Sequence, residues 1–361
     1  MMQRIKQRHR SGRLSLFAGA GARQHLTEHG LKASDITTML AASGGPKWMV
    51  LMGLDQYLNT SFFTADQHIS IMGSSAGAMR ACCYAQRDPA AAIQRFADAY
   101  TNTRYDAKPS PADISESAHV LLRELFGEDG IEEVLSNPYR HLNIVTARCH
   151  GLGASEHPVA QGLGMLAGFA LNKASRRWLD IPFERVIFFH GQPLAFNEHF
   201  DMRTRYVSLN AQNLYAAALA SGSIPMVMQG VFDIPGAPSG CYRDGGIIDY
   251  HFDLNTGDKG LCLYPHFNQT PRPAWFDKFG TRKIRPEHYH NTILLTPSED
   301  FLRSLPYGKI PDRKDFAELD DADRERFWRK VQSASQRLAE DLDDRLHHQD
   351  WRGVRPIEEL G

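Results

Sequence analysis

A glycine-flanked serine between a strand-forming run and a helix-forming run is the feature that most restricts the fold of this chain. Residues 69–72 favour a β-strand, residues 73–77 are Gly-Ser-Ser-Ala-Gly, and residues 78–86 favour a helix. Gly73 and Gly77, on either side of Ser75, allow strand and helix to approach without a Cβ clash. A serine at such a turn lies above the sheet edge, facing the free N–H groups of the helix. The pattern indicates a nucleophile elbow; the alternative is a glycine-rich turn.

A similar strand-turn-helix unit precedes this one. Residues 37–42 favour a buried strand, residues 43–47 form the loop Ser-Gly-Gly-Pro-Lys, and residues 48–59 carry apolar side chains at helical spacing. The two units form a β-α-β segment, whose strands should be parallel and whose crossover should be right-handed. The loop containing Gly44 and Gly45 then lies at the same sheet edge as Ser75, where open α/β sheets bind ligands.

The composition excludes several other classes of protein. The chain has 361 residues, 41 basic and 42 acidic side chains and a formal net charge of −1, so no strong field attracts nucleic acid. The five cysteines have no Cys-x-x-Cys spacing, and no cluster of metal-ligand residues is evident, so we expect reduced thiols and no metal or cofactor. These cysteines are Cys82, Cys83, Cys149, Cys241 and Cys262.

The first residues resemble a signal peptide, but only superficially. Residues 1–13 carry five basic side chains, and an apolar run follows over residues 14–22. This run is short and is interrupted by Gly19 and Gly21, which a secretory signal does not favour. Elsewhere no apolar run reaches the roughly 18 residues of a membrane span. We therefore expect a cytoplasmic protein.

A serine hydroxyl needs a base, and Asp244 is the most specific candidate in the sequence. It follows a short strand-like stretch and precedes Gly245 and Gly246, which let the backbone turn sharply. The alternative is an ordinary Asp-Gly turn. Gly44 and Gly45 could present N–H donors to a developing oxyanion, or could form only a turn.

Taken together, these motifs resemble the patatin-like phospholipase family. That family has a glycine-rich oxyanion loop with a basic residue, then Gly-x-Ser-x-Gly about 30 residues on, then Asp-Gly-Gly or Asp-Gly-Ala downstream. The segments here are residues 43–47, 73–77 and 244–246, and residues 218–225 (ALASGSIP) match a fourth family segment. The resemblance covers residues 37–248 and implies a three-layer α/β/α fold with a mainly parallel central sheet.

The resemblance also implies the chemistry. Ser75 would attack a carboxylic ester of a lipid, Asp244 would act as base, and the Gly44 and Gly45 amides would form the oxyanion hole. Lys47 occupies the family's basic position, for which we expect a structural role in the loop. Two residues depart from the family pattern, since Ser43 and Trp48 stand where glycines are usual.

Two other functions remain open. A Ser-His-Asp α/β-hydrolase also contains Gly-x-Ser-x-Gly, and it would need one of the histidines that follow Asp244. The available ones are His251, His266, His288 and His290. A catalytically silent scaffold that binds lipid or a partner protein is the other alternative.

Two further segments, one in the middle of the chain and one near its C-terminus, predict amphipathic helices. Residues 158–178 predict a core or cap helix, with a lipid-facing lid as the alternative. Residues 312–348 predict one or two charged helices with a narrow apolar stripe, which could pack on the sheet or form a homo-oligomer. We expect a lead-in over 1–36, a hydrolase domain over 37–305 and a helical extension over 306–361, with a lipid substrate and a transient membrane contact.

Overall fold

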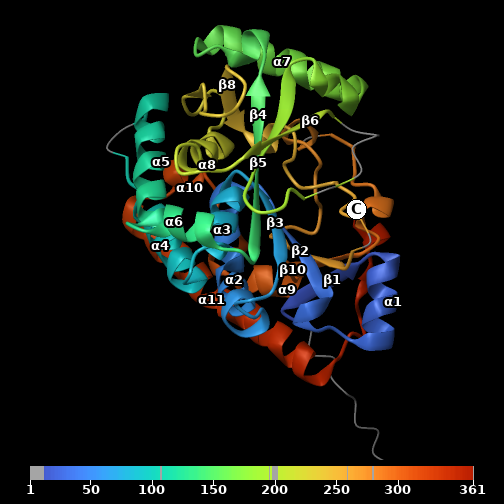
Figure 1. The fold of residues 1–361 in the computed structure, drawn as a ribbon. Coiled ribbons are helices and arrows are strands. Elements are labelled where there is room, and N and C mark those ends of the chain that lie inside the picture. Colours follow the sequence, from blue (N-terminus) through green and yellow to red (C-terminus); the bar gives the residue numbers. More distant parts are fainter. Residues whose placement is uncertain are drawn as a thin grey trace, which may run out of the picture.

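The structure is a computed structural model that describes residues 12–105, 108–194, 196, 202–257, 259–278 and 280–360. Its centre is a sheet with the strand order β11-β1-β10-β9-β2-β3-β4-β5-β6 (Figure 1). A further strand, β8, pairs with both β4 and β7. The strands of the described residues are β1 (Leu14–Ala18), β2 (Ile36–Ala41), β3 (Ile69–Ser74), β4 (Arg140–Cys149), β5 (Phe183–Phe189), β6 (Thr204–Ser208), β7 (Val231–Phe232), β8 (Cys241–Asp244), β9 (Leu261–Pro265), β10 (Thr292–Pro297) and β11 (Arg355–Pro356).

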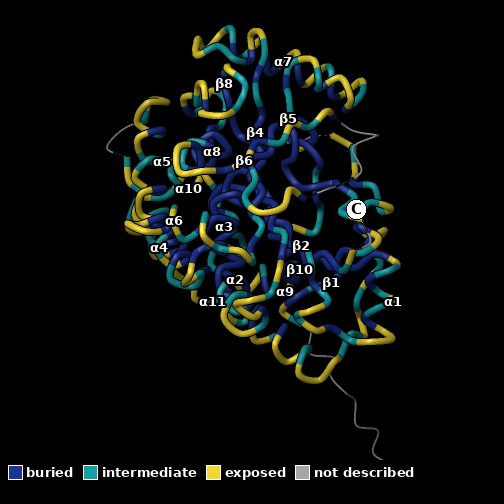
Figure 2. Tube along the Cα trace, viewed as in Figure 1, coloured by how far each residue is buried: buried dark blue, intermediate teal, exposed yellow. Residues whose placement is uncertain are grey.

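Most neighbouring strands of the sheet are parallel, as expected from the sequence. β2 pairs in parallel with both β3 and β9, and β3 pairs in parallel with β4. Antiparallel pairs occur on both sides of this centre, between β1 and β10 and between β4 and β5. The central strands are buried almost throughout, which is typical of parallel strands covered on both faces (Figure 2).

Helices cover the sheet and give the expected three-layer α/β/α arrangement. In Figure 1, α2, α3, α4 and α11 lie together on one side of the sheet, α1 lies on the other, and α7 crosses beyond the ends of β4 and β5. The α-helices of the described residues are α1 (Ala20–His29), α2 (Met52–Tyr57), α3 (Ala76–Tyr84), α4 (Pro89–Asn102), α5 (Pro111–Phe126), α6 (Gly130–Ser136), α7 (Pro158–Ala174), α8 (Leu214–Gly222), α9 (Glu299–Ser304), α10 (Asp315–Glu318) and α11 (Asp321–His348).

Both ends of the described chain join the central sheet. β1 pairs with β10 and with β11, so strands from the predicted lead-in and from the predicted extension lie side by side. The apolar run that resembles part of a signal peptide forms β1 and the start of α1, whereas residues 1–11 of that resemblance lie outside the described residues. The division at residues 36 and 305 stays a prediction.

The long charged segment near the C-terminus forms α11, which packs its apolar stripe inward. Phe327, Trp328, Val331 and Leu338 are buried in the main hydrophobic core, and the helix lies against α2. The apolar stripe of α11 therefore packs against other parts of the same chain. The predicted homo-oligomer stays a prediction, and it would have to use another surface of the helix.

Candidate active site

Ser75 lies in a sharp turn between β3 and α3, as the sequence predicts. It is the N-cap residue of α3, with φ 55° and ψ −129°. A positive φ is costly for a residue with a side chain, and such strain persists only where the surrounding structure holds it. The turn directs the serine toward the N-terminal end of α3, where N–H groups without intrahelical acceptors collect.

The glycines around Ser75 are required by the close packing of this turn. A Cβ atom on Gly77 would lie 1.9 Å from the carbonyl oxygen of Ala41 at the end of β2. A Cβ atom on Gly73 would lie 2.3 Å from the carbonyl oxygen of Gly77. Any side chain at either position would push the helix away from the sheet, so the motif serves the geometry of the turn.

The sheet brings Asp244 to Ser75 through β4. β3 runs parallel to β4 and places Ser74 opposite Val145, whereas β8 runs antiparallel to β4 and places Asp244 opposite Thr146. Because β5 occupies the other edge of β4 over the same residues, β3 and β8 share one edge and run toward each other. Their C-terminal ends therefore meet at adjacent positions of β4.

A direct hydrogen bond joins the two side chains. The Ser75 hydroxyl donates to Asp244 Oδ2 over 2.7 Å, and the Gly246 N–H donates to the other carboxylate oxygen over 2.7 Å. Both side chains are buried, with 4% and 6% of their residues' surface exposed. Burial raises the pKa of Asp244 above 3.8, although the hydrogen bond from Ser75 and the charge of Arg313 oppose this shift. A buried carboxylate with a raised pKa binds a proton more strongly than a carboxylate in water.

Three further serines hold the turn in place. The Ser75 N–H donates to Ser221 Oγ over 2.9 Å, and the Ser221 hydroxyl donates to the Val145 carbonyl over 2.7 Å. The Ser74 hydroxyl donates to the Asp249 carbonyl and lies 2.5 Å from the Ser43 hydroxyl. Ser43, which stands in place of a usual family glycine, therefore connects the glycine loop to the serine turn.

The Gly44–Gly45 loop lies beside this pair at the start of the 3-10 helix η2 (Gly45–Leu51). Gly44 is the N-cap residue and Gly45 the first residue, so intrahelical bonding does not use their N–H groups. A Cβ atom on Gly44 would lie 2.5 Å from the Phe267 ring, and Gly45 has φ 56°. Gly246 lies close by, since a Cβ atom there would meet Ser43 Oγ at 2.6 Å. Trp48, the second residue that departs from the family pattern, is buried and stacks on Phe96.

Residues 312 and 313, just before α10, also contribute to the site. The sequence analysis did not predict this contribution. Lys47 forms a salt bridge with Asp312 over 2.5 Å, and this contact ties the segment to the glycine loop. Arg313 follows, and its Nε would lie 2.8 Å from a Cβ atom on Gly45. No sequence motif marks Asp312 or Arg313, because the contact joins residues 265 positions apart.

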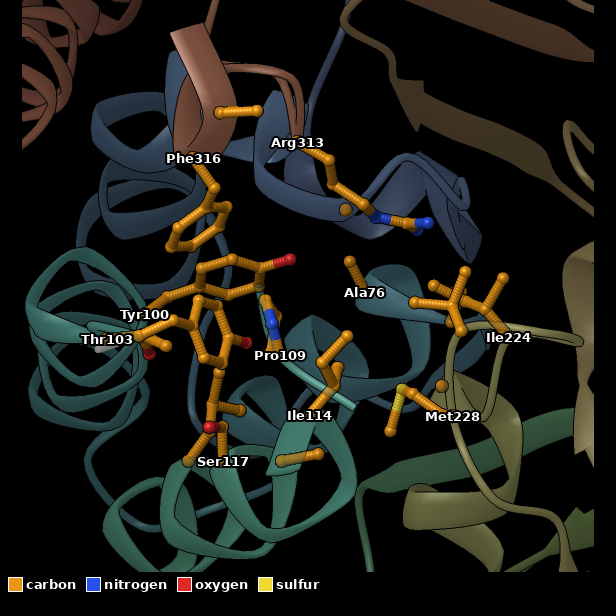
Figure 3. Close-up of a pocket in the computed structure, with 18 of the residues that line it drawn as sticks. Ala76, Tyr100, Thr103, Pro109, Ile114, Ser117, Ile224, Met228, Arg313 and Phe316 are labelled. Atoms are coloured by element: carbon orange, nitrogen blue, oxygen red, sulfur yellow. The ribbon is translucent and has the colours of Figure 1, made fainter. Parts of the chain in front are cut away.

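Two cavities meet at Ser75. The first, the apolar cavity, has a volume of about 610 Å³ and includes side chains of α3, α4, α5 and α10, among them Met79, Tyr100, Leu121 and Phe316. In Figure 3, Tyr100, Ile114, Met228 and Phe316 surround this space, and the Arg313 guanidinium lies near Ala76.

The second, the cationic cavity, has a volume of about 360 Å³ and contains four basic side chains, Lys47, Lys278, Arg313 and Lys314. Its acidic members are Asp312, which pairs with Lys47, and Asp244. Desolvation and the nearby charges of Lys47 and Arg313 lower the pKa of Lys278 to about 8. Gly44 lines this cavity and Gly45 lines the apolar one, so the glycine loop spans the boundary.

Two of the histidines that a Ser-His-Asp triad could use have other partners. His251 accepts a hydrogen bond from the Arg272 N–H and stacks on Tyr250, and burial lowers its pKa well below 6.5. His288 contacts Asp253 over 3.2 Å. Among the described residues, no histidine lines either cavity that Ser75 lines. Within the same residues, no group of three or more His, Cys, Asp or Glu side chains is arranged to hold a metal ion.

Comparison with known families agrees with this geometry. A family model described as patatin-like phospholipase matches residues 67–251, just over half of the chain, and this span contains Ser75, Ser221 and Asp244. The chain belongs to the patatin-like phospholipase family. The resemblance found in the sequence and the fold class that it implies are therefore confirmed.

Solved structures give weaker matches. The type III effector ExoU is 16% identical, with a TM-score of 0.32 over 87% of this chain and 54% of ExoU. VipD from Legionella pneumophila is 14% identical, with a TM-score of 0.30 over 70% of this chain and 53% of VipD. The chain thus spans about half the length of these proteins. No curated protein matches.

Proposed function

We propose that this protein is a serine acyl hydrolase that cleaves carboxylic esters of lipids with Ser75 and Asp244. The observation that carries the proposal is the 2.7 Å hydrogen bond from the Ser75 hydroxyl to Asp244, at the junction of two cavities. Family membership supports a lipid ester as substrate. A direct serine–aspartate contact supports a dyad rather than a triad, because the Asp244 carboxylate already accepts a hydrogen bond through the proton that must be removed.

The geometry supports a two-step reaction through an acyl-enzyme. Asp244 removes the Ser75 proton while the serine oxygen attacks the ester carbonyl, and the protonated Asp244 returns that proton to the leaving alcohol. In this scheme the N–H groups of Gly44 and Gly45 stabilise the oxyanion of the tetrahedral intermediate. A water molecule, deprotonated by Asp244, then attacks the acyl-enzyme carbonyl, and the fatty acid leaves as Asp244 returns the proton to the Ser75 oxygen. Lys47 acts in this scheme through the loop, which its salt bridge holds.

The two cavities support a division of the substrate. The apolar cavity suits the acyl chain, since a chain of methylene groups gains about 0.8 kcal/mol for each one buried. The cationic cavity suits an alcohol portion that carries negative charge, such as the phosphate of a phospholipid or lysophospholipid. We therefore favour a phospholipid ester over a neutral lipid.

Substitution of the two residues tests the proposal. Ser75→Ala should abolish hydrolysis of p-nitrophenyl octanoate and labelling by a fluorophosphonate probe. Asp244→Asn should reduce kcat/KM about 10²- to 10⁴-fold, the usual range for loss of a general base. Wild-type rates in Ser75→Ala would contradict the assignment.

Histidine variants separate this proposal from the Ser-His-Asp alternative. His251→Asn, His266→Asn, His288→Asn and His290→Asn, each checked for folding by circular dichroism, should retain activity. A loss of 10²-fold or more in one folded histidine variant would favour a triad. Absence of probe labelling in the wild type would favour the catalytically silent scaffold.

A further inference from the structure

Helix α7 carries its large apolar side chains on the outside of the molecule. Val159, Leu163, Leu166 and Phe169 are spaced by four, three and three residues and are 66%, 53%, 62% and 41% exposed. This spacing places them on one helix face. A surface helix normally turns its apolar face toward the core, so α7 is inverted. Figure 2 shows exposed and intermediate residues along α7.

Apart from Met165, the buried residues on the inward face of α7 are small or polar, and they fix the orientation of the helix. A Cβ atom on Gly164 would lie 2.4 Å from the backbone of Gly153, and one on Gly168 would lie 2.9 Å from the Phe183 ring. Gln161 donates to the Ser155 carbonyl, and Asn172 donates to Asp277 over 2.7 Å. Rotation of α7 about its axis would bring larger side chains into the close contacts that Gly164 and Gly168 make. The sequence of the helix therefore favours the outward position of its exposed apolar residues.

The exposed apolar face is continuous with the cationic cavity. Met165 of α7 lines that cavity together with Met226 and Trp275, which are 54% and 42% exposed. A Cβ atom on Gly162 would lie 3.7 Å from the Met226 methyl group, so the loop and the helix are adjacent.

The 3-10 helix η5 (Arg176–Asp180) packs against α7, and Trp178 in η5 and Ile181 just after it are also exposed. We call this set the α7 surface: Val159, Leu163, Leu166, Phe169, Trp178, Ile181, Met226 and Trp275. It holds eight of the twelve large apolar residues that are exposed in the described part of the chain. Such concentration marks an interaction site, because exposed apolar residues on a soluble protein are usually scattered.

The charges around the α7 surface favour a lipid surface as its partner. α7 contains no acidic residue, and its single charged residue is Lys173 in the last turn. Lys278 and Lys314 add positive charge at the adjoining cavity. Tryptophan side chains, here Trp178 and Trp275, favour the boundary between acyl chains and headgroups. Among the described helices none could span a bilayer. A helix with one strongly apolar face binds a lipid surface by lying in the interface plane.

We infer that the α7 surface docks the protein onto a lipid surface that contains anionic lipids, with α7 lying flat among the headgroups. Docking would place the cationic cavity at the level of the headgroups and Ser75 within reach of an ester in the same leaflet. The access of Ser75 to an ester in the leaflet rests on the proposed function, whereas docking depends only on the α7 surface.

Sedimentation with vesicles of phosphatidylcholine and phosphatidylglycerol tests the inference. Leu163→Ser/Leu166→Ser should lower the partition coefficient about tenfold or more, because two anchoring side chains are lost. Val120→Ser/Phe232→Ser, which changes two residues of similar exposure elsewhere, should bind as the wild type does. Leu166→Glu, a second variant, should bind still less to anionic vesicles. Hydrolysis of soluble p-nitrophenyl butyrate should be unchanged in all these variants.

Several outcomes would overturn the inference. Wild-type protein that does not sediment with the vesicles, or α7 variants that sediment as well as the wild type, would contradict docking. A wild-type dimer in light scattering that becomes monomeric in Leu163→Ser/Leu166→Ser would assign the surface to a second copy of the chain. If Ser75→Ala binds vesicles and the wild type hydrolyses no ester, docking is supported and the proposed function fails.

Discussion

The apolar cavity and the cationic cavity share Ser75, but they are built from different parts of the chain and differ in chemistry. Helices α3, α4 and α5 contribute apolar side chains to the first, whereas loops at residues 43–47, 275–278 and 312–314 contribute basic side chains to the second. Only the second cavity adjoins the α7 surface, through Met165, Met226 and Trp275.

This difference shows how one nucleophile can recognise two ends of a substrate. Rigid helices form the space suited to an acyl chain, and loops form the space suited to a charged group. The glycine loop and Arg313 lie at the boundary, so the reacting carbonyl would be held between the two environments. If the cavities divide the substrate in this way, substitutions in the apolar cavity should change the preference for the acyl chain. Substitutions in the cationic cavity should change the preference for a charged alcohol portion.

The largest expected effect comes from filling the apolar cavity. Ala118→Trp places a large ring in this space, and displacing about four methylene groups at about 0.8 kcal/mol each should lower kcat/KM for p-nitrophenyl laurate roughly 200-fold. Hydrolysis of p-nitrophenyl acetate, whose acyl group needs no such space, should be nearly unchanged. Equal losses with both esters would contradict the assignment of the acyl chain to this cavity.

Removing charge from the cationic cavity should have a smaller effect. Lys278→Ala/Lys314→Ala should lower kcat/KM about tenfold for a nitrophenyl octanoate that carries a carboxylate on its ring, since exposed charge pairs contribute up to about 1 kcal/mol each. Unsubstituted p-nitrophenyl octanoate should react at the wild-type rate. Lys32→Ala/Lys330→Ala, which removes two exposed lysines elsewhere, is the control.

The preference for the charged ester over the neutral ester should change a few-fold with pH. The pKa of Lys278 is lowered to about 8, so this side chain loses its positive charge as the pH rises from 7 to 9. The ratio of kcat/KM for the charged ester to that for the neutral ester should therefore fall across this interval. Lys278→Ala should abolish the step, and a step that persists in this variant would assign it to another group.

The smallest expected effect concerns stability at the boundary between the cavities. Burial raises the pKa of Asp244 in the folded protein above 3.8, so its ionised form costs stability once the pH exceeds the folded value. The favourable contribution of its protonated form is complete below the unfolded pKa and is lost as the pH rises through the folded pKa. Asp244→Asn should therefore raise Tm by a few degrees at pH 7. The difference should shrink as the pH falls toward 4.

Helices α7 and α11 show where prediction from sequence fails. Both carry an apolar stripe at helical spacing, and α11 buries its stripe as expected. The sequence favours a core or cap helix for α7, whereas in the structure four of its large apolar residues face outward. Periodicity shows which residues share a face, but it does not say which face points inward. Gly164 and Gly168, four residues apart, are the feature of the sequence that could have identified the inward face of α7. Close approach of another backbone or ring requires glycine at these positions.

The sequence by itself determined the local geometry of the site. The glycines around Ser75 permit a tight strand-to-helix turn, and the Gly44–Gly45 loop and the Asp244-Gly245-Gly246 turn are equally local in origin. Tertiary structure alone decided which side chains meet: β4 aligns the ends of β3 and β8, and the Lys47–Asp312 contact brings Arg313 to the glycine loop. Local turns follow from backbone sterics, which depend on a few neighbouring residues, whereas contacts between distant segments depend on how the whole core packs.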